Sequence, residues 1–215
     1  MKQKKRGKKE TKKINQQPVY YNLNPIYMNF KQSLKDLKLI KNYLIFSTIL
    51  FLIITLIGAF FPIFFKEQII ELLNQIIQQT TGLNSIELTR FIIANNIKSS
   101  FLALFFGIFL GLIPIGIIII NAYVLGFVIN KTILFQGPLI LWKLLPHGIF
   151  ELPAILISIS LGLRLGLFLF TYNGKNKKQE FFKWLKQSVR IFILIIIPLL
   201  VIAGIIEGFL IWFLG

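Results

Sequence analysis

The chain has 215 residues, of which 55% are hydrophobic and only 15% are charged, with a mean hydropathy of +0.73. Soluble domains average roughly 45–50% apolar and about 25% charged residues, so this composition indicates a membrane protein. The formal net charge is +16, and the chain contains no Cys and one His. Disulfides, thiolate chemistry and a His-rich metal site are therefore excluded.

The N-terminal region is strongly basic, because residues 1–41 contain 12 Lys or Arg against two Asp or Glu. Residues 1–17 have almost no apolar side chains, so we expect residues 1–25 to form a disordered tail that binds anionic lipid headgroups loosely. No folded nucleic-acid-binding motif accompanies this charge, and a specific nucleic-acid partner is not expected.

Three polar segments have the spacing of amphipathic helices. Residues 26–41 and 171–190 combine Lys with a narrow apolar face, which predicts helices on the membrane surface. Residues 66–79 place Ile and Leu on one face with Glu and Gln opposite. We expect this last segment to cap the bundle outside the membrane, with contact to a partner protein as the alternative.

Four apolar stretches are long enough to cross a membrane. Residues 42–65 carry no charge, and a helix of this length exceeds the ~30 Å hydrocarbon core of a bilayer. The other stretches lie near 99–130, 139–170 and 191–214. The stretch 99–130 is long for one crossing and short for two.

The distribution of Lys and Arg constrains the number of crossings. Residues 171–190 hold six Lys or Arg against one Glu, whereas the charges of residues 66–98 balance. Cytoplasmic loops are the positive ones, so residues 1–41 and 171–190 should both be cytoplasmic and an even number of crossings should separate them. Four simple spans do not satisfy this condition.

Two arrangements satisfy it and give about five membrane segments. Region 99–130 crosses twice, with a break near Pro114 or Asn121, or region 139–170 contains a broken or re-entrant helix around its prolines. The sequence therefore predicts an all-α, polytopic transmembrane bundle with short amphipathic surface helices. We expect the protein to lie in the cell membrane, with its N-terminus in the cytoplasm and its C-terminus outside.

Polar side chains within the apolar stretches are the candidate functional residues, because a charge at mid-bilayer costs about 2.5–3.5 kcal/mol. They could fix helix order by hydrogen bonding, form a proton or ion path, or form an intramembrane active site. The candidate polar core comprises His147, Glu151, Arg164, Glu207, Asn95, Asn96 and Asn121. Residues expected to break or pack helices are Gly107, Gly111, Pro114, Pro146, Gly148 and Pro153.

No motif typical of a hydrolase or a nucleotide-binding protein is present. The sequence lacks GxSxG, HExxH and a Walker loop, and His147 with Glu151 supplies only two of the three or four ligands that zinc needs. We therefore expect no enzymatic activity, no cofactor and no metal.

Six segments carry a family resemblance. They are FIIANN (91–96), GIFLG (107–111), NAYVLG (121–126), LLPHGIFELPA (144–154), LGLRLG (161–166) and LLVIAGIIEG (199–208). Together they resemble the stage II sporulation protein M family over residues 30–212, with PHGIFELPA as the specific part. Ala122 stands where the family often has Gly, and it is small enough to keep helices close.

The resemblance implies an all-helical membrane protein with five spans. In spore-forming bacteria, the member that names the family anchors two peptidoglycan-degrading proteins at the septal membrane, and it is not itself known as the hydrolase. Other members occur in bacteria and archaea that do not sporulate. The resemblance therefore favours a membrane scaffold for protein partners over a small transporter or permease subunit that uses intramembrane His and Glu. An intramembrane enzyme is the third hypothesis.

Overall fold

The computed structural model describes residues 30–139 and 145–214, with the side chains of residues 145–147 and 214 excepted. The described residues are overwhelmingly helical and contain no strand, which confirms the predicted all-α class. Five helical segments are long and apolar enough to cross a membrane, which agrees with the predicted number. The basic tail expected at residues 1–25 lies outside the described residues.

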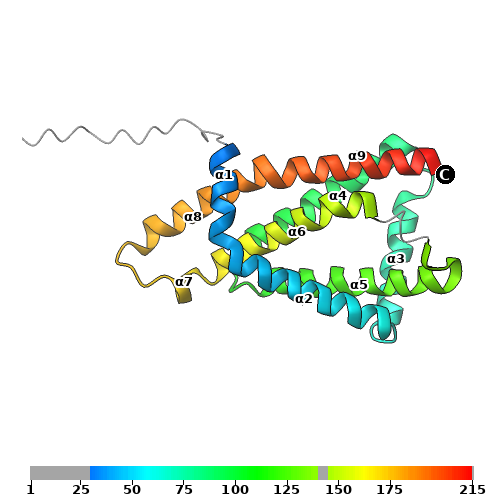
Figure 1. Cartoon of the computed structure of the whole chain (residues 1–215), viewed down its shortest axis with the longest axis horizontal. Coiled ribbons are helices and arrows are strands. Elements are labelled where there is room, and N and C mark those ends of the chain that lie inside the picture. The colour runs from blue at the N-terminus through cyan, green and yellow to red at the C-terminus, as the bar shows by residue number, and fades with distance from the viewer. Residues whose placement is uncertain (1–29, 140–144, 215) are drawn as a thin grey trace, which may run out of the picture.

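The helical elements follow one another with short connections (Figure 1). In chain order they are α1 (Phe30–Asp36), η1 (Leu37–Ile40), α2 (Lys41–Phe60), α3 (Lys66–Thr80), α4 (Ser85–Phe105), η2 (Phe106–Ile108), α5 (Leu112–Gln136), α6 (Leu145–Gly166), α7 (Phe168–Thr171), α8 (Lys177–Ile191), η4 (Phe192–Ile196) and α9 (Ile197–Leu214). The five candidate spans are Phe30–Phe60, Ser85–Ile108, Leu112–Gln136, Gly148–Gly166 and Lys177–Phe213.

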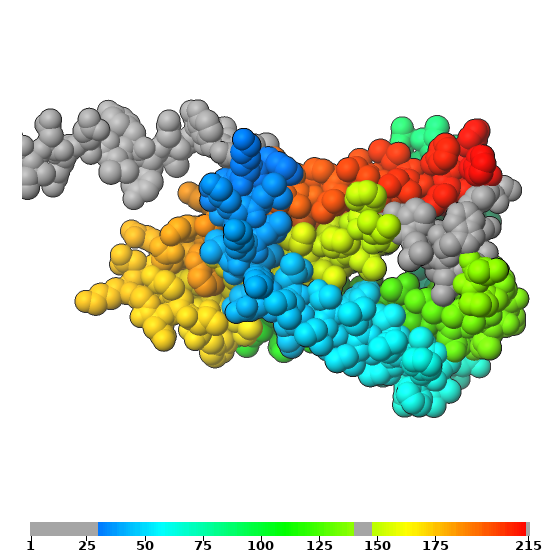
Figure 2. Space-filling model, in the orientation of Figure 1, coloured from blue at the N-terminus to red at the C-terminus, as the bar shows by residue number. Residues whose placement is uncertain are grey.

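The spanning helices form two groups. Helix α2 packs along α5, where Gly58 and Gly126 bring the two backbones into contact, while α4, α6 and α9 pack on one another. Figure 1 shows the two groups close together near α1 and α8 and apart where α3 crosses their other ends. In the space-filling view of Figure 2, α1 covers the junction of the groups at the first of these ends. We call these the α1–α8 end and the α3 end.

Helix α6 is the centre of the bundle and is buried along most of its length from Ala154 onward. Small residues allow this. A Cβ atom added at Gly162 would overlap the backbone carbonyl of Ala103, and one added at Gly166 would overlap that of Gly107. The α6 backbone therefore lies directly against the end of α4 and the η2 turn, as small residues permit in membrane bundles.

The region 99–130 belongs to two spans. The chain turns between η2 and α5, where Leu110 and Gly111 both adopt positive φ angles of 56° and 73°. Glycine tolerates this conformation without steric cost, whereas the Cβ atom of Leu110 makes a positive φ sterically unfavourable. The break thus precedes the two positions, Pro114 and Asn121, at which the sequence analysis placed it.

The second span begins earlier than predicted. Asn84 caps α4, because its side chain accepts hydrogen bonds from the backbone N–H groups of Ile86 and Glu87 at 3.0 Å, and Glu87 accepts one from the Asn84 N–H at 3.0 Å. This capping box fixes the start of α4 at Ser85. Residues that precede the predicted apolar stretch 99–130, Lys98 among them, are therefore part of a candidate spanning helix.

The candidate span within region 139–170 is one uninterrupted helix, α6, which is followed by the short helix α7. Helix α6 runs from Leu145 to Gly166 and continues through Pro153, an exposed position in the helix interior. The broken or re-entrant alternative is therefore not found from residue 145 onward. Residues 140–144 lie outside the described part of the chain.

The last span contains a distortion at Pro198. This residue has no N–H to donate to the carbonyl of Leu194, four residues earlier. The segment η4 is a π-helix, in which the Ile197 N–H donates to the Phe192 carbonyl, five residues earlier. The wider turn absorbs the missing hydrogen bond, so α8, η4 and α9 form one continuous helical path.

The two basic helices lie at the same end of the bundle. Helix α1 contacts α8, and Asp36 of α1 forms an ion pair with Arg190 of α8. Lys residues of both helices therefore share one side of the bundle, and an even number of crossings separates them. This is the arrangement that the charge distribution requires.

Candidate functional site

Three of the predicted polar residues meet between α4, α6 and α9. Glu151 of α6 is hydrogen-bonded to the side chain of Asn96 in α4. Glu207 of α9 lies close enough to Glu151 for their carboxyl groups to interact electrostatically. Each side chain comes from a different spanning helix, so the cluster Asn96–Glu151–Glu207 links the three helices of one group. We call it the carboxyl cluster.

The cluster depends on close contact between α4 and α9. A Cβ atom at Gly204 would overlap the side chain of Ile93, and one at Gly208 would overlap that of Thr89. These glycines flank Glu207 on α9 and bring that helix against α4. The local sequence of α9 therefore places the half-buried carboxyl group of Glu207 near Glu151 of α6.

The chemistry of the cluster is that of two nearby carboxyl groups with one amide. Such a pair can share a proton, and the amide can donate to the ionised form. His147 precedes Glu151 by one helical turn, but its side chain is not among those described. Within the described part of the chain, no three His, Cys, Asp or Glu residues lie together in a way that could hold a metal ion.

Arg164 lies far from the carboxyl cluster, at the α1–α8 end. Its side chain is only 4% exposed, its guanidinium carbon lies 4.2 Å from the centre of the Trp184 ring, and it donates to the Gln187 side chain at 3.3 Å. Asp36 is near enough to interact with it electrostatically. Arg164 thus anchors α6 to α8 through a cation–π contact and a hydrogen bond.

The acidic partner at this end is Asp36, which is 4% exposed. It accepts a hydrogen bond from Gln32 at 2.9 Å, in addition to its ion pair with Arg190. Phe168 packs edge-on against Trp184 beside this network, with ring centroids 4.9 Å apart. The network ties α1, α6 and α8 together and leaves Arg164 without direct access to Glu151.

Two predicted polar residues do not join either group. Asn95 is exposed on α4, and Asn121 is exposed on α5, where its side chain donates to the Ile117 carbonyl of its own helix at 2.8 Å. The structure therefore brings together Asn96, Glu151 and Glu207 from the predicted polar core. It separates them from Arg164 and from these two amides.

The predicted packing residues have different surroundings. Gly107 lies against Gly162, Pro114 is buried beside the same glycine, and Gly111 turns the chain into α5. Gly148 has open space around it. Pro146 belongs to the first turn of α6, where its side chain is not described.

Two residues that the sequence analysis did not single out hold α2 to α5. The Tyr123 hydroxyl donates to the Phe61 carbonyl at 2.7 Å, and the Asn130 amide donates to the Ala59 carbonyl at 2.8 Å. Both acceptors are carbonyls at the end of α2 that have no partner within that helix. The seven-residue spacing of Tyr123 and Asn130 places them on one face of α5, a signal that was available in the sequence.

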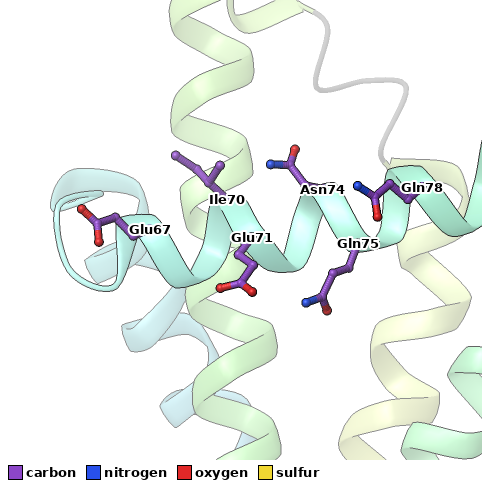
Figure 3. Close-up of a pocket in the computed structure, with 6 residues that line it drawn as sticks. All are labelled: Glu67, Ile70, Glu71, Asn74, Gln75 and Gln78. Carbon is purple, nitrogen blue, oxygen red and sulfur yellow. The ribbon is translucent and has the colours of Figure 1, made fainter.

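Helix α3 presents an exposed surface at the opposite end from Arg164. Ile69 is buried against Tyr123 and Phe127 of α5, whereas most of the remaining helix is exposed. A shallow groove of about 560 Å³ follows the helix and is lined by Glu67, Ile70, Glu71, Asn74, Gln75 and Gln78. In Figure 3, Ile70 and Asn74 point to one side of α3 and Glu71 and Gln75 to the other.

Two proteins of an archaeon are similar in sequence to this chain. One uncharacterized protein of Methanocaldococcus jannaschii is 38% identical over 102 residues, which is 46% of this chain and 46% of that protein. A second uncharacterized protein of the same organism is 37% identical over 126 residues, which is 55% of this chain and 68% of that protein. The chain thus spans about half the length of the first relative, and no solved structure matches it.

The family model described as "Stage II sporulation protein M" matches residues 47–210. This match extends from α2 to α9 and includes all three residues of the carboxyl cluster. Five apolar helices and a match over most of its length establish this chain as a multi-pass membrane protein that belongs to the stage II sporulation protein M family.

Proposed function

We propose that this protein is a scaffold in the cell membrane that anchors partner proteins through the α3 end of its bundle. The observation that carries the proposal is α3, a helix that crosses the ends of the spanning helices and is mostly exposed (Figure 1). Any enzymatic activity then belongs to the partners rather than to this chain. A scaffold is also the role that the family resemblance implies.

The exposed side chains of α3 suit contact with another protein. Ile69 is 5% exposed, whereas Ile70, Leu72, Ile76 and Ile77 are 37–59% exposed. Glu and Gln side chains separate these apolar residues along the helix. An apolar patch rimmed by polar groups is typical of an interaction surface, and the carboxamides can satisfy hydrogen bonds at its edge.

The proposal also fixes an orientation. With the Lys-rich α1–α8 end in the cytoplasm, α3 and the C-terminus lie on the outer side of the cell membrane. The partners are then envelope-facing proteins, and the anchoring surface is held at the membrane by five spans.

Site-specific crosslinking tests the proposal, and the absence of native Cys makes it direct. Single Cys residues at Gln75 and Gln78 of α3 should crosslink to a stoichiometric protein partner in native membranes. A Cys at Ile53, an exposed apolar position of α2, is the matched control and should not capture that partner. Equal capture from all three positions would contradict a surface specific to α3.

A variant of the apolar face sharpens this test. Ile76→Ser together with Ile77→Ser should release the partner during purification in mild detergent, while Gln78→Ser together with Gln79→Ser should retain it. Each truncated apolar side chain should weaken binding by about 1–2 kcal/mol, which is roughly tenfold per residue. Retention of the partner by both pairs would assign anchoring to another surface.

The carboxyl cluster supports a second candidate function, a small transporter or permease subunit. Two carboxyl groups and an amide meet inside a spanning bundle, where ionisable residues often mark ion or proton pathways. Proton or cation flux into vesicles that contain the purified protein, abolished by Glu151→Gln and by Glu207→Gln without loss of folding, would favour this candidate. No flux above empty vesicles would leave the scaffold as the sole proposal.

A further inference from the structure

Lys98 lies on the exposed side of α4, about halfway along the span, and no ion pair joins it to another residue of the described ranges. Lys98 follows Ser85 by 13 residues and precedes Ile108 by ten, which places it about 20 Å and about 15 Å from the two ends of the span. A Lys side chain is too short to reach an aqueous interface over either distance without cost. Its depth is therefore close to that of the bilayer centre.

The side chain of Lys98 points away from the rest of the bundle. Asn96 and Ser100, two residues before and after it, face α6, because Asn96 is bonded to Glu151 and the Ser100 carbonyl accepts from Ser158. At 3.6 residues per turn, Lys98 lies on the opposite side of α4. It is exposed, and it forms no ion pair with any residue in the described ranges.

The surroundings of Lys98 form a surface suited to another helix. Ala94 and Asn95 lie one turn before it, and Phe101 lies one turn after it, all exposed on α4. A small residue permits close approach of a second helix, an amide adds hydrogen bonding, and a ring adds contact area. We call Ala94, Asn95, Lys98 and Phe101 the Lys98 face.

We propose that the Lys98 face binds a membrane-spanning helix of a different protein that carries an Asp or Glu near the middle of its span. A charge at mid-bilayer is costly, and such residues nearly always face a protein interior and pair with an opposite charge. The described residues of this chain supply no such partner to Lys98. A carboxylate on a neighbouring helix satisfies the ammonium group and leaves neither charge in lipid.

The charge argues against a second copy of this chain on the same surface. In a two-fold symmetric dimer each surface meets itself, so two Lys98 side chains would approach each other at mid-membrane. Like charges there would repel strongly. The inference rests on the scaffold proposal, since it names the chemistry of one partner, but it uses α4 rather than α3 as the contact.

A defined probe tests the inference without knowledge of the natural partner. The probe is a synthetic Leu/Ala transmembrane peptide with one central Asp, compared with the same peptide carrying Leu, in vesicles of zwitterionic lipid with the purified full chain. Energy transfer between labelled protein and labelled peptide should show ~5–30-fold tighter binding of the Asp peptide. The preference should disappear in Lys98→Leu and be retained in Arg90→Gln, which removes a charge near the end of the same helix.

Each other outcome overturns the inference. Equal binding of both peptides by the wild-type chain, or an unchanged preference in Lys98→Leu, would show that Lys98 does not recognise a carboxylate. Energy transfer between copies of the chain that is lost in Lys98→Leu would assign the face to self-association. Loss of folding in Lys98→Leu is controlled by Lys98→Gln, which keeps a polar group and should also lose the preference.

The result is separable from the scaffold test. If the α3 variants release a native partner and the Asp peptide is not preferred, the scaffold proposal stands and the Lys98 inference fails. If the Asp peptide is preferred and the α3 crosslinks are absent, partner binding belongs to the membrane interior instead.

Discussion

The two ends of the bundle are held together by different means. At the α1–α8 end, Asp36, Arg164, Arg190 and Trp184 connect three helices, and glycines bring α6 against its neighbours. At the α3 end the helix groups diverge, and a single amphipathic helix crosses them (Figure 1). Buried charged groups thus connect helices at the first end, whereas the second end leaves most of α3 exposed.

The largest expected difference between the ends is their accessibility from outside the cell. A Cys at Gln78 of α3 should react with an impermeant thiol reagent in intact cells, and a Cys at Asn176 should react only after permeabilisation. A Cys at Phe51, which is buried, is the unreactive control. Labelling of Asn176 from outside would reverse the proposed orientation, and labelling of both on one side would contradict five crossings.

Breaking the α1–α8 network should cause the largest loss of stability. Asp36→Ala removes the ion-pair partner of the partly buried Arg190 and a nearby negative charge from the buried Arg164, and it should lower the free energy of unfolding by about 3 kcal/mol. Glu180→Ala removes the partner of the exposed Lys183 at the same end and should cost less than about 1 kcal/mol. Thermal unfolding in mild detergent measures both. Equal losses would mean that Asp36 does not connect the helices.

Forcing α6 away from α4 should lower the free energy of unfolding less than the loss of Asp36 does. Gly162→Ala places a methyl group against the Ala103 carbonyl and should cost about 1–3 kcal/mol in unfolding free energy. Gly116 has open space around it, so Gly116→Ala should be neutral or slightly stabilising. The same unfolding measurement compares the pair. A neutral Gly162→Ala would show that α6 and α4 can separate without loss.

The carboxyl cluster should contribute least to stability. Glu151→Leu removes the hydrogen bond with Asn96 and should cost about 1–2 kcal/mol, whereas Glu151→Gln keeps donor and acceptor groups and should cost less. If Gln and Leu are equally destabilising in detergent, the hydrogen-bonding account of this residue is wrong. If both fold normally and flux is lost in vesicles, the cluster serves transport.

Composition and charge were sufficient to predict the class and the number of spans. The apolar stretches identify membrane helices, and the shared sidedness of the two Lys-rich segments requires an even number of crossings between them. That argument uses only loop charges, so it does not depend on where each helix begins. The five candidate spans and the contact between α1 and α8 agree with it.

The boundaries of the second span were mispredicted for a physical reason. Charge was used to mark the ends of apolar stretches, and Arg90 and Lys98 therefore excluded the first half of α4. The capping box at Asn84 and Glu87 was the better signal, because it specifies where a helix begins irrespective of hydropathy.

The candidate polar core was predicted in part. Spacing along one helix can relate His147 to Glu151, but contact between α4, α6 and α9 depends on how whole helices pack. The contact of Asn96 with Glu151 joins residues far apart in the chain, and no local pattern contains it. The separation of Arg164 from Glu151 follows once α6 is a single continuous helix, because 13 residues of helix extend about 20 Å along its axis.

The continuous path from α8 to α9 has a mechanical consequence. It contains no loop from Lys177 to Phe213, so a rod of about 55 Å joins the Lys-rich end to the end that carries Glu207. A tilt imposed on α8 is passed on to α9 only as far as this helical path stays rigid. The π-turn at Phe192–Ile196 is its one widened joint within the described residues, and bending would concentrate there. The widened turn is therefore the point at which a tilt of α8 is either passed to the segment that carries Glu207 or absorbed.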